Sequence, residues 1–269
     1  MPRYGGVLNF GNFSGFTRDL VLWNLGAYFF LGLMGLASPQ GYSMIFGLLA
    51  LTPYSFVHGA IWQMVTYPFV HQGILNTAFE LLSLWFLGSF LEGNHGSRWL
   101  MEIFAVSALG SGVAGVVLAE ATNITGIPII GCWGAIFGLM MAFGVLYADL
   151  EFMMFPLPLM IKAKYLVAVY MLIAFAMLFF SVDRIFAFSQ LGGALFGYLF
   201  VKFAPRRGLS KAGSAQYFDW RNQYYRWKRR RAAKKFQVYM KKQNRDVQFD
   251  DDGKYIDPDK DGNDRSKWN

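Results

Sequence analysis

Long apolar runs separated by short polar connections fill most of the chain up to about residue 203. A membrane-spanning helix needs roughly 20 mainly apolar residues. Six runs reach or approach that length, and they cover about residues 19–37, 72–91, 98–119, 131–148, 160–180 and 185–203. Glu80 interrupts the second run, and a short polar turn separates the last two. The pattern predicts an all-α, polytopic membrane protein with six transmembrane helices.

The segment between the first two runs, residues 38–71, has a different pattern. It is apolar, but prolines and glycines break it, at Pro39, Gly41, Pro53, Gly59 and Pro68. Proline interrupts a helix, so this segment is too broken to span a membrane. Irregular backbone is tolerated at membrane depth only where it rests on protein or lines a cavity. We expect an irregular, membrane-embedded first loop that lies on other helices.

Charge is distributed unevenly and predicts an orientation. Residues 202–269 hold nineteen of the 25 Lys and Arg residues, although they make up only the last quarter of the chain. The connections at 38–71 and 120–130 contain no Lys or Arg, whereas the alternate connections do. The positive-inside rule then predicts that both termini are cytoplasmic, in a bacterial inner membrane or an equivalent one.

These observations predict three regions. We expect a cytoplasmic N-terminal segment at 1–18, a membrane domain at 19–203 and a basic cytoplasmic tail at 204–269, which ends in an acidic stretch.

Short motifs recur in a fixed order on the second, fourth and sixth runs. Trp62-Gln63 and Thr66-Tyr67 precede the second run, and Glu92 follows it. The fourth run begins with "GCWGAIFG" at 131–138, and the sixth contains "SQLGGALFGYL" at 189–199. This order resembles the rhomboid intramembrane serine proteases over residues 19–203. The resemblance implies a six-transmembrane-helix, rhomboid-like bundle.

The resemblance also implies roles for four glycines. Gly131 and Gly134 match the outer glycines of the family's nucleophile loop. Gly193 and Gly197 match the G-x-x-x-G pattern of its last helix, in which small residues allow close helix packing.

At the catalytic positions the chain departs from the family. Trp133 stands where rhomboids have the nucleophilic serine, and Gln190 stands where they have the histidine base. The former oxyanion region is represented by His71, Asn76 and Glu80. The resemblance therefore implies a pseudoprotease without catalytic residues. We expect Trp133 to fill the former site, with its indole N–H bonded to Gln190 or Asn76.

Two questions stay open at this stage. Glu80 is either an acid that fills space in the former oxyanion site or a group that binds a partner, because intramembrane carboxyls are usually functional. The alternative to a pseudoprotease is an intramembrane endopeptidase with an unconventional site that uses Cys132, His71 or Glu80. Against it, we expect Cys132 to face away from the site, and the sequence shows no acid or hydroxyl partner for His71.

No cofactor or metal is predicted. Cys132 is the chain's one cysteine, which excludes a multi-cysteine metal site. The acidic end contains the start of a calcium-loop pattern at 257–262, but Trp268 stands where the bidentate acid is required.

The sequence of the tail predicts a long helix at about 214–245, with an aromatic stripe that includes Trp220 and Trp227. Arg229, Arg230 and Arg231 form a basic run beside it. Such a helix suits the lipid bilayer surface or a partner, and nucleic acid is not expected. As partners we expect membrane proteins, through their transmembrane helices or as a larger membrane complex.

Overall fold

The computed structural model describes residues 15–154, 159–180, 183–204, 209–243, 247–250 and 255–256. The chain divides into two compact units, Met1–Gly208 and Leu209–Asn269. Most of the expected N-terminal segment lies outside the described residues, and so does the acidic end beyond residue 256.

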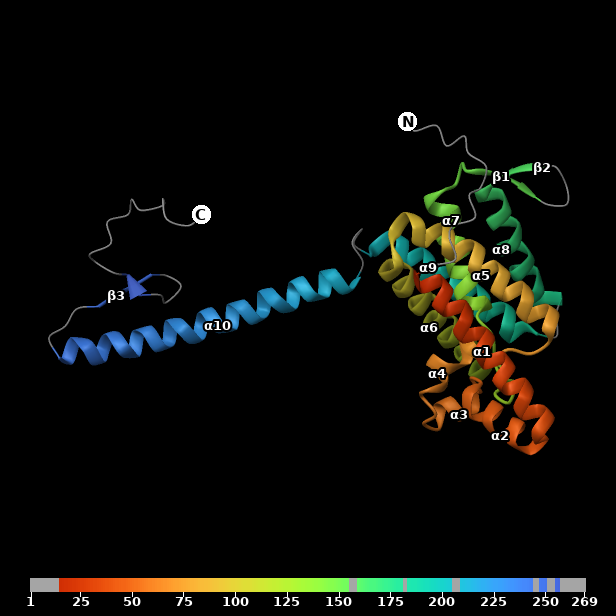
Figure 1. The fold of residues 1–269 in the computed structure, drawn as a ribbon, viewed down its shortest axis with the longest axis horizontal. Helices are drawn as coiled ribbons and strands as arrows, with labels where there is room; N and C mark the ends of the chain where they lie inside the picture. Colours follow the sequence, from red (N-terminus) through yellow and green to blue (C-terminus); the bar gives the residue numbers. More distant parts are fainter. Residues whose placement is uncertain are drawn as a thin grey trace. The chain divides into compact units, whose positions relative to one another are not determined.

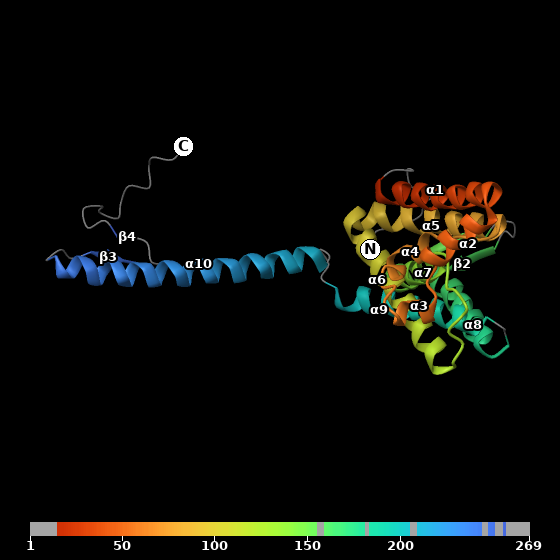
Figure 2. The same ribbon diagram turned by 90° about the horizontal axis from the view of Figure 1, so that it is seen from below.

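Each of the six apolar runs forms a helix in the first unit (Figures 1 and 2). The helices are α1 (Gly15–Ala37), α5 (Ile74–His95), α6 (Ser97–Ala121), α7 (Trp133–Leu146), α8 (Ala163–Phe180) and α9 (Arg184–Phe203). By length and composition, α1, α5, α6 and α9 could cross a membrane, whereas α7 and α8 are shorter apolar helices. The mainly helical, multi-pass membrane character is thereby supported, and length alone identifies four spans.

Helix α7 lies in the middle of this unit and packs against α5, α6, α8 and α9. Nine of its 14 residues are buried, and two of those nine are glycines. Because α7 is apolar on every side, it can be surrounded by other helices without burying polar groups.

Small residues allow α7 and α9 to approach closely. A Cβ atom at Gly197 would lie 2.5 Å from the carbonyl oxygen of Gly138, and one at Gly193 would collide with the carbonyl oxygen of Gly134. On the opposite side, a Cβ atom at Gly134 would collide with the hydroxyl of Ser111 on α6. The two G-x-x-x-G patterns therefore face each other, and their backbones are in direct contact.

The first loop contains more helix than its prolines suggest. It forms α2 (Pro39–Leu49), α3 (Pro53–Val57), α4 (Gln63–Thr66) and the 3-10 helix η1 (Tyr67–Phe69). Pro39 and Pro53 occupy the first position of their helices, where the missing N–H costs nothing. Every one of these helices is too short to span a membrane, as expected.

Side chains of the first-loop motif satisfy the backbone between these short helices. The amide of Gln63 accepts from the N–H of Thr52 at 3.1 Å and donates to the carbonyl of Gly47 at 3.0 Å. The hydroxyl of Thr66 donates to the carbonyl of Leu49 at 2.7 Å. The hydroxyl of Tyr67 donates to the carbonyl of Ala108 in α6 at 2.6 Å, so the loop rests on another helix as predicted. These bonds supply the partners that water would otherwise provide.

Glu92 joins three helices near one end of the unit. Its carboxylate accepts from the N–H of Phe16 at 2.7 Å and from the N–H of Thr17 at 2.9 Å, at the start of α1. It also accepts from the hydroxyl of Ser97, at the start of α6. A carboxylate at a helix N-terminus satisfies free N–H groups and complements the helix dipole.

A short hairpin was not predicted from the sequence and corrects the all-helical expectation. Strands β1 (Glu151–Met154) and β2 (Leu159–Lys162) pair antiparallel between α7 and α8. Beside it, Lys164 donates to Asp149 at 2.8 Å, and Lys162 lies 3.9 Å from Glu151. The two lysines of the connection between α7 and α8 therefore have acidic partners.

The second unit consists of α10 (Leu209–Lys242) and two short strands, β3 (Gln248–Phe249) and β4 (Tyr255–Ile256). Helix α10 begins about five residues before the predicted start and ends about three residues before the predicted end. The amide of Gln237 donates to the carbonyl of Val247 at 3.2 Å, and the rings of Phe236 and Phe249 meet edge to face. The strands thus fold back onto their own helix.

Candidate functional site

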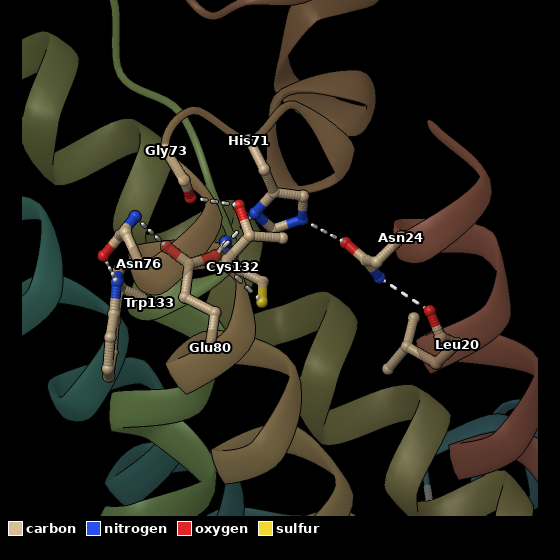
Figure 3. Close-up of polar contacts among 9 residues, drawn as sticks. Leu20, Asn24, His71, Gly73, Asn76, Glu80, Cys132 and Trp133 are labelled. Atoms are coloured by element: carbon tan, nitrogen blue, oxygen red, sulfur yellow. Dashed lines mark hydrogen bonds and ion pairs between the residues drawn. The ribbon is translucent and has the colours of Figure 1, made fainter. Parts of the chain in front are cut away.

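The two positions that the resemblance aligns with the rhomboid dyad lie on different helices, Trp133 on α7 and Gln190 on α9. Trp133 is the first residue of α7, and its indole is partly buried against the main hydrophobic core. Its N–H donates to the Oδ1 atom of Asn76 at 3.1 Å (Figure 3). Of the two expected partners, Gln190 and Asn76, the indole therefore bonds to Asn76. Gln190 is buried on α9, one turn before Gly193. The structure therefore links Trp133 to α5, and Gln190 contributes to the buried face of α9.

Glu80 is the centre of a largely buried polar cluster (Figure 3). The cluster consists of Asn24, His71, Asn76, Glu80, Cys132 and Trp133. Oε1 of Glu80 accepts from the amide of Asn76 at 3.1 Å. Oε2 accepts from the N–H of Cys132 at 3.1 Å and lies 3.5 Å from the Cys132 sulfur. Only 1% of the Glu80 surface is exposed, so protein groups replace its hydration.

Gly131 makes this arrangement sterically possible. Its φ is +81°, a left-handed conformation that favours glycine. A Cβ atom there would lie 2.6 Å from Oε1 of Glu80 and 2.9 Å from Oε2. The N–H of Gly131 donates to the carbonyl of Tyr67 at 3.1 Å, which ties this loop to the first loop. The glycine thus leaves room for a carboxylate directly against the backbone.

His71 connects the cluster to α1. Its Nε2 atom lies 2.7 Å from Oδ1 of Asn24, whose amide donates to the carbonyl of Leu20 at 2.7 Å. Its Nδ1 atom lies 2.7 Å from Oε2 of Glu80, although it is not aligned for a hydrogen bond. His71 therefore has the acidic partner that could not be recognised in the sequence. Cys132 also turns toward this cluster, whereas we had expected it to face away.

Sequence reasoning missed Asn24 and the role of Cys132. Asn24 is completely buried, and it stands in an otherwise apolar stretch of α1. A lone amide in a membrane helix is costly unless it has partners, and that signal was available in the sequence. The approach of Cys132 was not available, because it depends on how the loop before α7 turns at Gly131.

Chemically, the cluster combines an imidazole, a carboxylate and a thiol in a water-poor site. The donors that could stabilise an oxyanion, namely the N–H of Cys132 and the amide of Asn76, are already directed at Glu80. A negative charge developing beside this carboxylate would be repelled rather than stabilised. Both donors beside Trp133 are therefore engaged by Glu80.

The tail residues form a separate group on α10. Trp227 is 55% exposed, and the guanidinium of Arg231 lies 5.3 Å from the centre of its ring system. Arg229 and Arg230 are exposed on the same helix. Trp220 belongs to α10, but its side chain lies outside the described part of the chain.

Comparison with known proteins supports this architecture. Residues 23–235 match the family described as "Eukaryotic integral membrane protein (DUF1751)". The chain is 28% identical over 171 residues to Rhomboid-like protein 19 of Arabidopsis thaliana, a region that covers 61% of this chain and 55% of that protein. It is 29% identical over 156 residues to Rhomboid protease GluP of Bacillus subtilis (strain 168), which covers 58% of this chain and 28% of that protein.

The chain thus spans about half the length of the plant relative and a little over a quarter of the bacterial one. The family match includes every residue of the polar cluster, since the cluster extends from Asn24 to Trp133.

Proposed function

Because this chain belongs to the rhomboid-like family described as "Eukaryotic integral membrane protein (DUF1751)", we propose that it is a non-catalytic membrane protein that binds transmembrane partners or serves as a subunit of a membrane complex. One observation carries the proposal. Close helix contacts are present at Gly134, Gly193 and Gly197, while Trp133 and Gln190 stand where the resemblance places the serine and histidine of the rhomboid dyad.

The surroundings of Glu80 support the absence of proteolysis. The oxygens of Glu80 accept the hydrogen bonds of the donors around the former oxyanion region. Peptide-bond cleavage requires donors that are free to stabilise the developing oxyanion, and it requires a nucleophile with a base. Trp133 supplies neither group, and its indole is fixed on Asn76.

The alternative is an endopeptidase that uses Cys132. In its favour, His71, Glu80 and Cys132 lie together. Against it, only 1% of Cys132 is exposed, so its sulfur has no open path to a peptide. The thiol contacts the carboxylate that is itself paired with His71. We therefore favour the non-catalytic function.

We also propose that the six helices formed by the apolar runs, α1 and α5 to α9, all span the membrane. Helix α7 has 14 residues and rises roughly 21 Å, which is less than the hydrocarbon thickness of about 30 Å. The loop before it is tied to the first loop by the Leu51–Ile129 bridge and by the Gly131–Tyr67 bond, so it can enter the membrane on a protein surface. Both termini are then cytoplasmic. Because the family is described as eukaryotic, we propose a membrane of a eukaryotic cell rather than a bacterial inner membrane.

The basic tail helix is the second surface that we propose for contacts. Exposed Trp227, Phe236 and Tyr239 accompany the Arg and Lys residues of α10. Aromatic and basic side chains together favour the headgroup region of an anionic leaflet or an acidic partner.

Co-purification tests the proposed function. The tagged chain is isolated in mild detergent, and the accompanying proteins are identified by mass spectrometry. One companion that stays through size exclusion supports a dedicated subunit, and several intact single-pass proteins support an adaptor. Recovery of the same proteins as truncated fragments, lost in a Cys132→Ser variant, would overturn the non-catalytic function.

Restoring the dyad tests which residues account for the proposed lack of proteolysis. If cleavage of a model transmembrane peptide appears in the Trp133→Ser, Gln190→His double variant, the loss of the dyad is the main block. If it appears only when Glu80→Asn is added, the internal carboxylate is a further block. The single variant Gln190→His is the matched control, because it restores a base without a nucleophile.

Impermeant thiol labelling tests the topology. On a Cys132→Ser background, Asn123→Cys lies in the exposed connection after α6, and Lys241→Cys lies near the end of α10. We expect a membrane-impermeant maleimide to reach Lys241→Cys from the cytoplasmic side only and Asn123→Cys from the opposite side only. Labelling of both from one side would contradict the six-span topology.

A further inference from the structure

We propose that His71, Glu80 and Cys132 form a zinc-binding site, with the imidazole Nδ1 atom, a carboxylate oxygen and the thiolate sulfur as ligands. Their possible ligand atoms all lie within 4.8 Å of one another, and all three side chains are buried. The site is independent of the proposed partner binding, and it departs from the expectation of no metal that the lone cysteine suggested.

The ligand set suits zinc. Zinc binds cysteine, histidine and carboxylate ligands at about 2.0–2.3 Å, usually in a tetrahedron. Ligand atoms around such an ion are roughly 3.4 Å apart, as follows from those bond lengths. Here the sulfur of Cys132 lies 3.5 Å from Oε2 of Glu80, and Nδ1 of His71 lies 2.7 Å from the same oxygen. A small opening of the His71–Glu80 contact would therefore accommodate the ion.

Asn24 fixes the imidazole in the form that a metal requires. The Asn24 amide donates to the carbonyl of Leu20, so its Oδ1 atom faces His71 as an acceptor. Nε2 of His71 must then carry the hydrogen, and the lone pair of a neutral imidazole is left on Nδ1. A metal-bound histidine characteristically donates its other N–H to a carbonyl or carboxylate, and Asn24 supplies such a carbonyl.

Nδ1 of His71 also requires a cation or a proton beside it. It is a buried polar atom that has no aligned hydrogen-bond partner, although it faces an oxygen at 2.7 Å. Two acceptors do not approach so closely without a cation or proton between them. Zinc would satisfy both atoms.

Charge and access are consistent with a metal. A doubly charged zinc ion with one thiolate, one carboxylate and one neutral imidazole forms a neutral site, which lowers the cost of burial. Asn76, which holds the other oxygen of Glu80, is exposed on the surface of α5, and Trp133 beside it is partly buried. An ion or water could enter past these two side chains, and the three protein ligands leave one position for water.

Metal analysis of the full-length chain tests the proposal. The protein carries a non-histidine affinity tag, is purified in detergent from zinc-supplemented cells and is dialysed against metal-free buffer. We expect roughly one zinc per chain by elemental mass spectrometry. In cobalt-substituted protein we expect a near-ultraviolet thiolate-to-metal charge-transfer band. Since Cys132 is the one cysteine of the chain, that band can be assigned to it.

Variants separate this site from nonspecific metal. Cys132→Ser keeps the size of the side chain and should lose both the zinc and the cobalt band. Asn24→Leu removes the partner of Nε2 and should weaken zinc binding by about 10- to 100-fold. His58→Gln is the matched control, because His58 is exposed on the first loop and should leave the zinc content unchanged.

Two outcomes overturn the proposal. Wild-type protein that contains no zinc above blank and shows no cobalt band would mean that His71 and Glu80 form an ordinary ion pair. Equal zinc in wild type and Cys132→Ser would place the metal elsewhere. If Cys132→Ser is not recovered as a monodisperse protein, Cys132→Ala and the cobalt band of the wild type decide the question.

Discussion

Gly197 on α9 is where one added methyl group gives the sharpest test of the helix packing. An alanine Cβ atom there would lie 2.5 Å from the carbonyl oxygen of Gly138, 2.6 Å from its Cα atom and 2.8 Å from its carbonyl carbon. All three are backbone atoms within α7, so no side-chain rotation can relieve the contact. Since favourable contacts begin at about 3.5 Å, α9 would have to move away from α7 by roughly 1 Å.

Two opposing effects determine the magnitude. Overpacking of this kind costs about 1–3 kcal/mol of unfolding free energy. Replacing a helical glycine by alanine gains about 1 kcal/mol from helix propensity. Because the backbone contact cannot yield locally, we expect the upper part of the first range and a net loss of about 1–2 kcal/mol for Gly197→Ala. That corresponds to a decrease of roughly 2–8 °C in the unfolding temperature of a unit of this size.

Cys132 provides the assay. It is the chain's one cysteine, only 1% of it is exposed, and it lies at the start of α7. A thiol-reactive fluorophore will therefore label it only when the centre of the first unit opens. The midpoint of labelling against temperature, in detergent and in chelator-treated protein, reports the stability of the α7 environment.

The control applies the same chemical change where space is open. Cβ atoms at Gly26 and Gly32 on α1 would meet nothing within 4 Å. Gly26→Ala and Gly32→Ala should therefore leave the unfolding temperature unchanged or raise it. If Gly197→Ala melts at or above the wild-type temperature while both controls behave as expected, the close approach of α7 and α9 is refuted.

Three further predictions use the same thermal assay. Gln63→Leu removes the partners of the Thr52 N–H and the Gly47 carbonyl, and should cost about 1–3 kcal/mol, with Gln72→Leu as a surface control. Glu92→Gln places an amide N–H against the N–H and hydroxyl donors at the starts of α1 and α6. It should lower the free energy of unfolding by about 2 kcal/mol or more. No loss of stability would contradict the role of Glu92 as an acceptor. The hydrogen bond from Lys164 holds the pKa of Asp149 below its usual range, so the stabilisation from Asp149 is complete above the ordinary carboxyl pKa and is lost only as the pH falls through the lowered value. Asp149→Asn should therefore have the same slight effect at about pH 6 and about pH 8, and a pH-dependent difference would contradict the pairing.

The sequence allowed the helices of the first unit to be predicted well, because a membrane helix must be apolar along its whole length. The six runs coincide with α1 and α5 to α9 to within a few residues at each end. The two short strands between α7 and α8 were missed, because "EFMM" and "LMIK" continue the apolar composition of their neighbours. Composition alone does not distinguish a short strand from the end of a helix.

The candidate site was predictable in part. The positions of Trp133, Asn76 and Glu80 followed from motif order, and the bond between Trp133 and Asn76 was one of two considered. The pairing of His71 with Glu80 and Asn24 was not foreseen, because it joins α1, the loop before α5 and α5 itself. Such a contact depends on the angle at which helices pack, and a single sequence carries little information on that angle.

The hydrogen bonds of the first loop also set an order of assembly. Tyr67 is held by Ala108, Leu51 pairs with Ile129, and Tyr67 accepts from Gly131. These partners are synthesised 41 to 78 residues later in the chain, as their numbering shows. The apolar segment at 38–71 therefore leaves the ribosome before the surface on which it rests exists. It must wait at the membrane interface, or be shielded there by another protein, until α6 and the loop that follows it have been made.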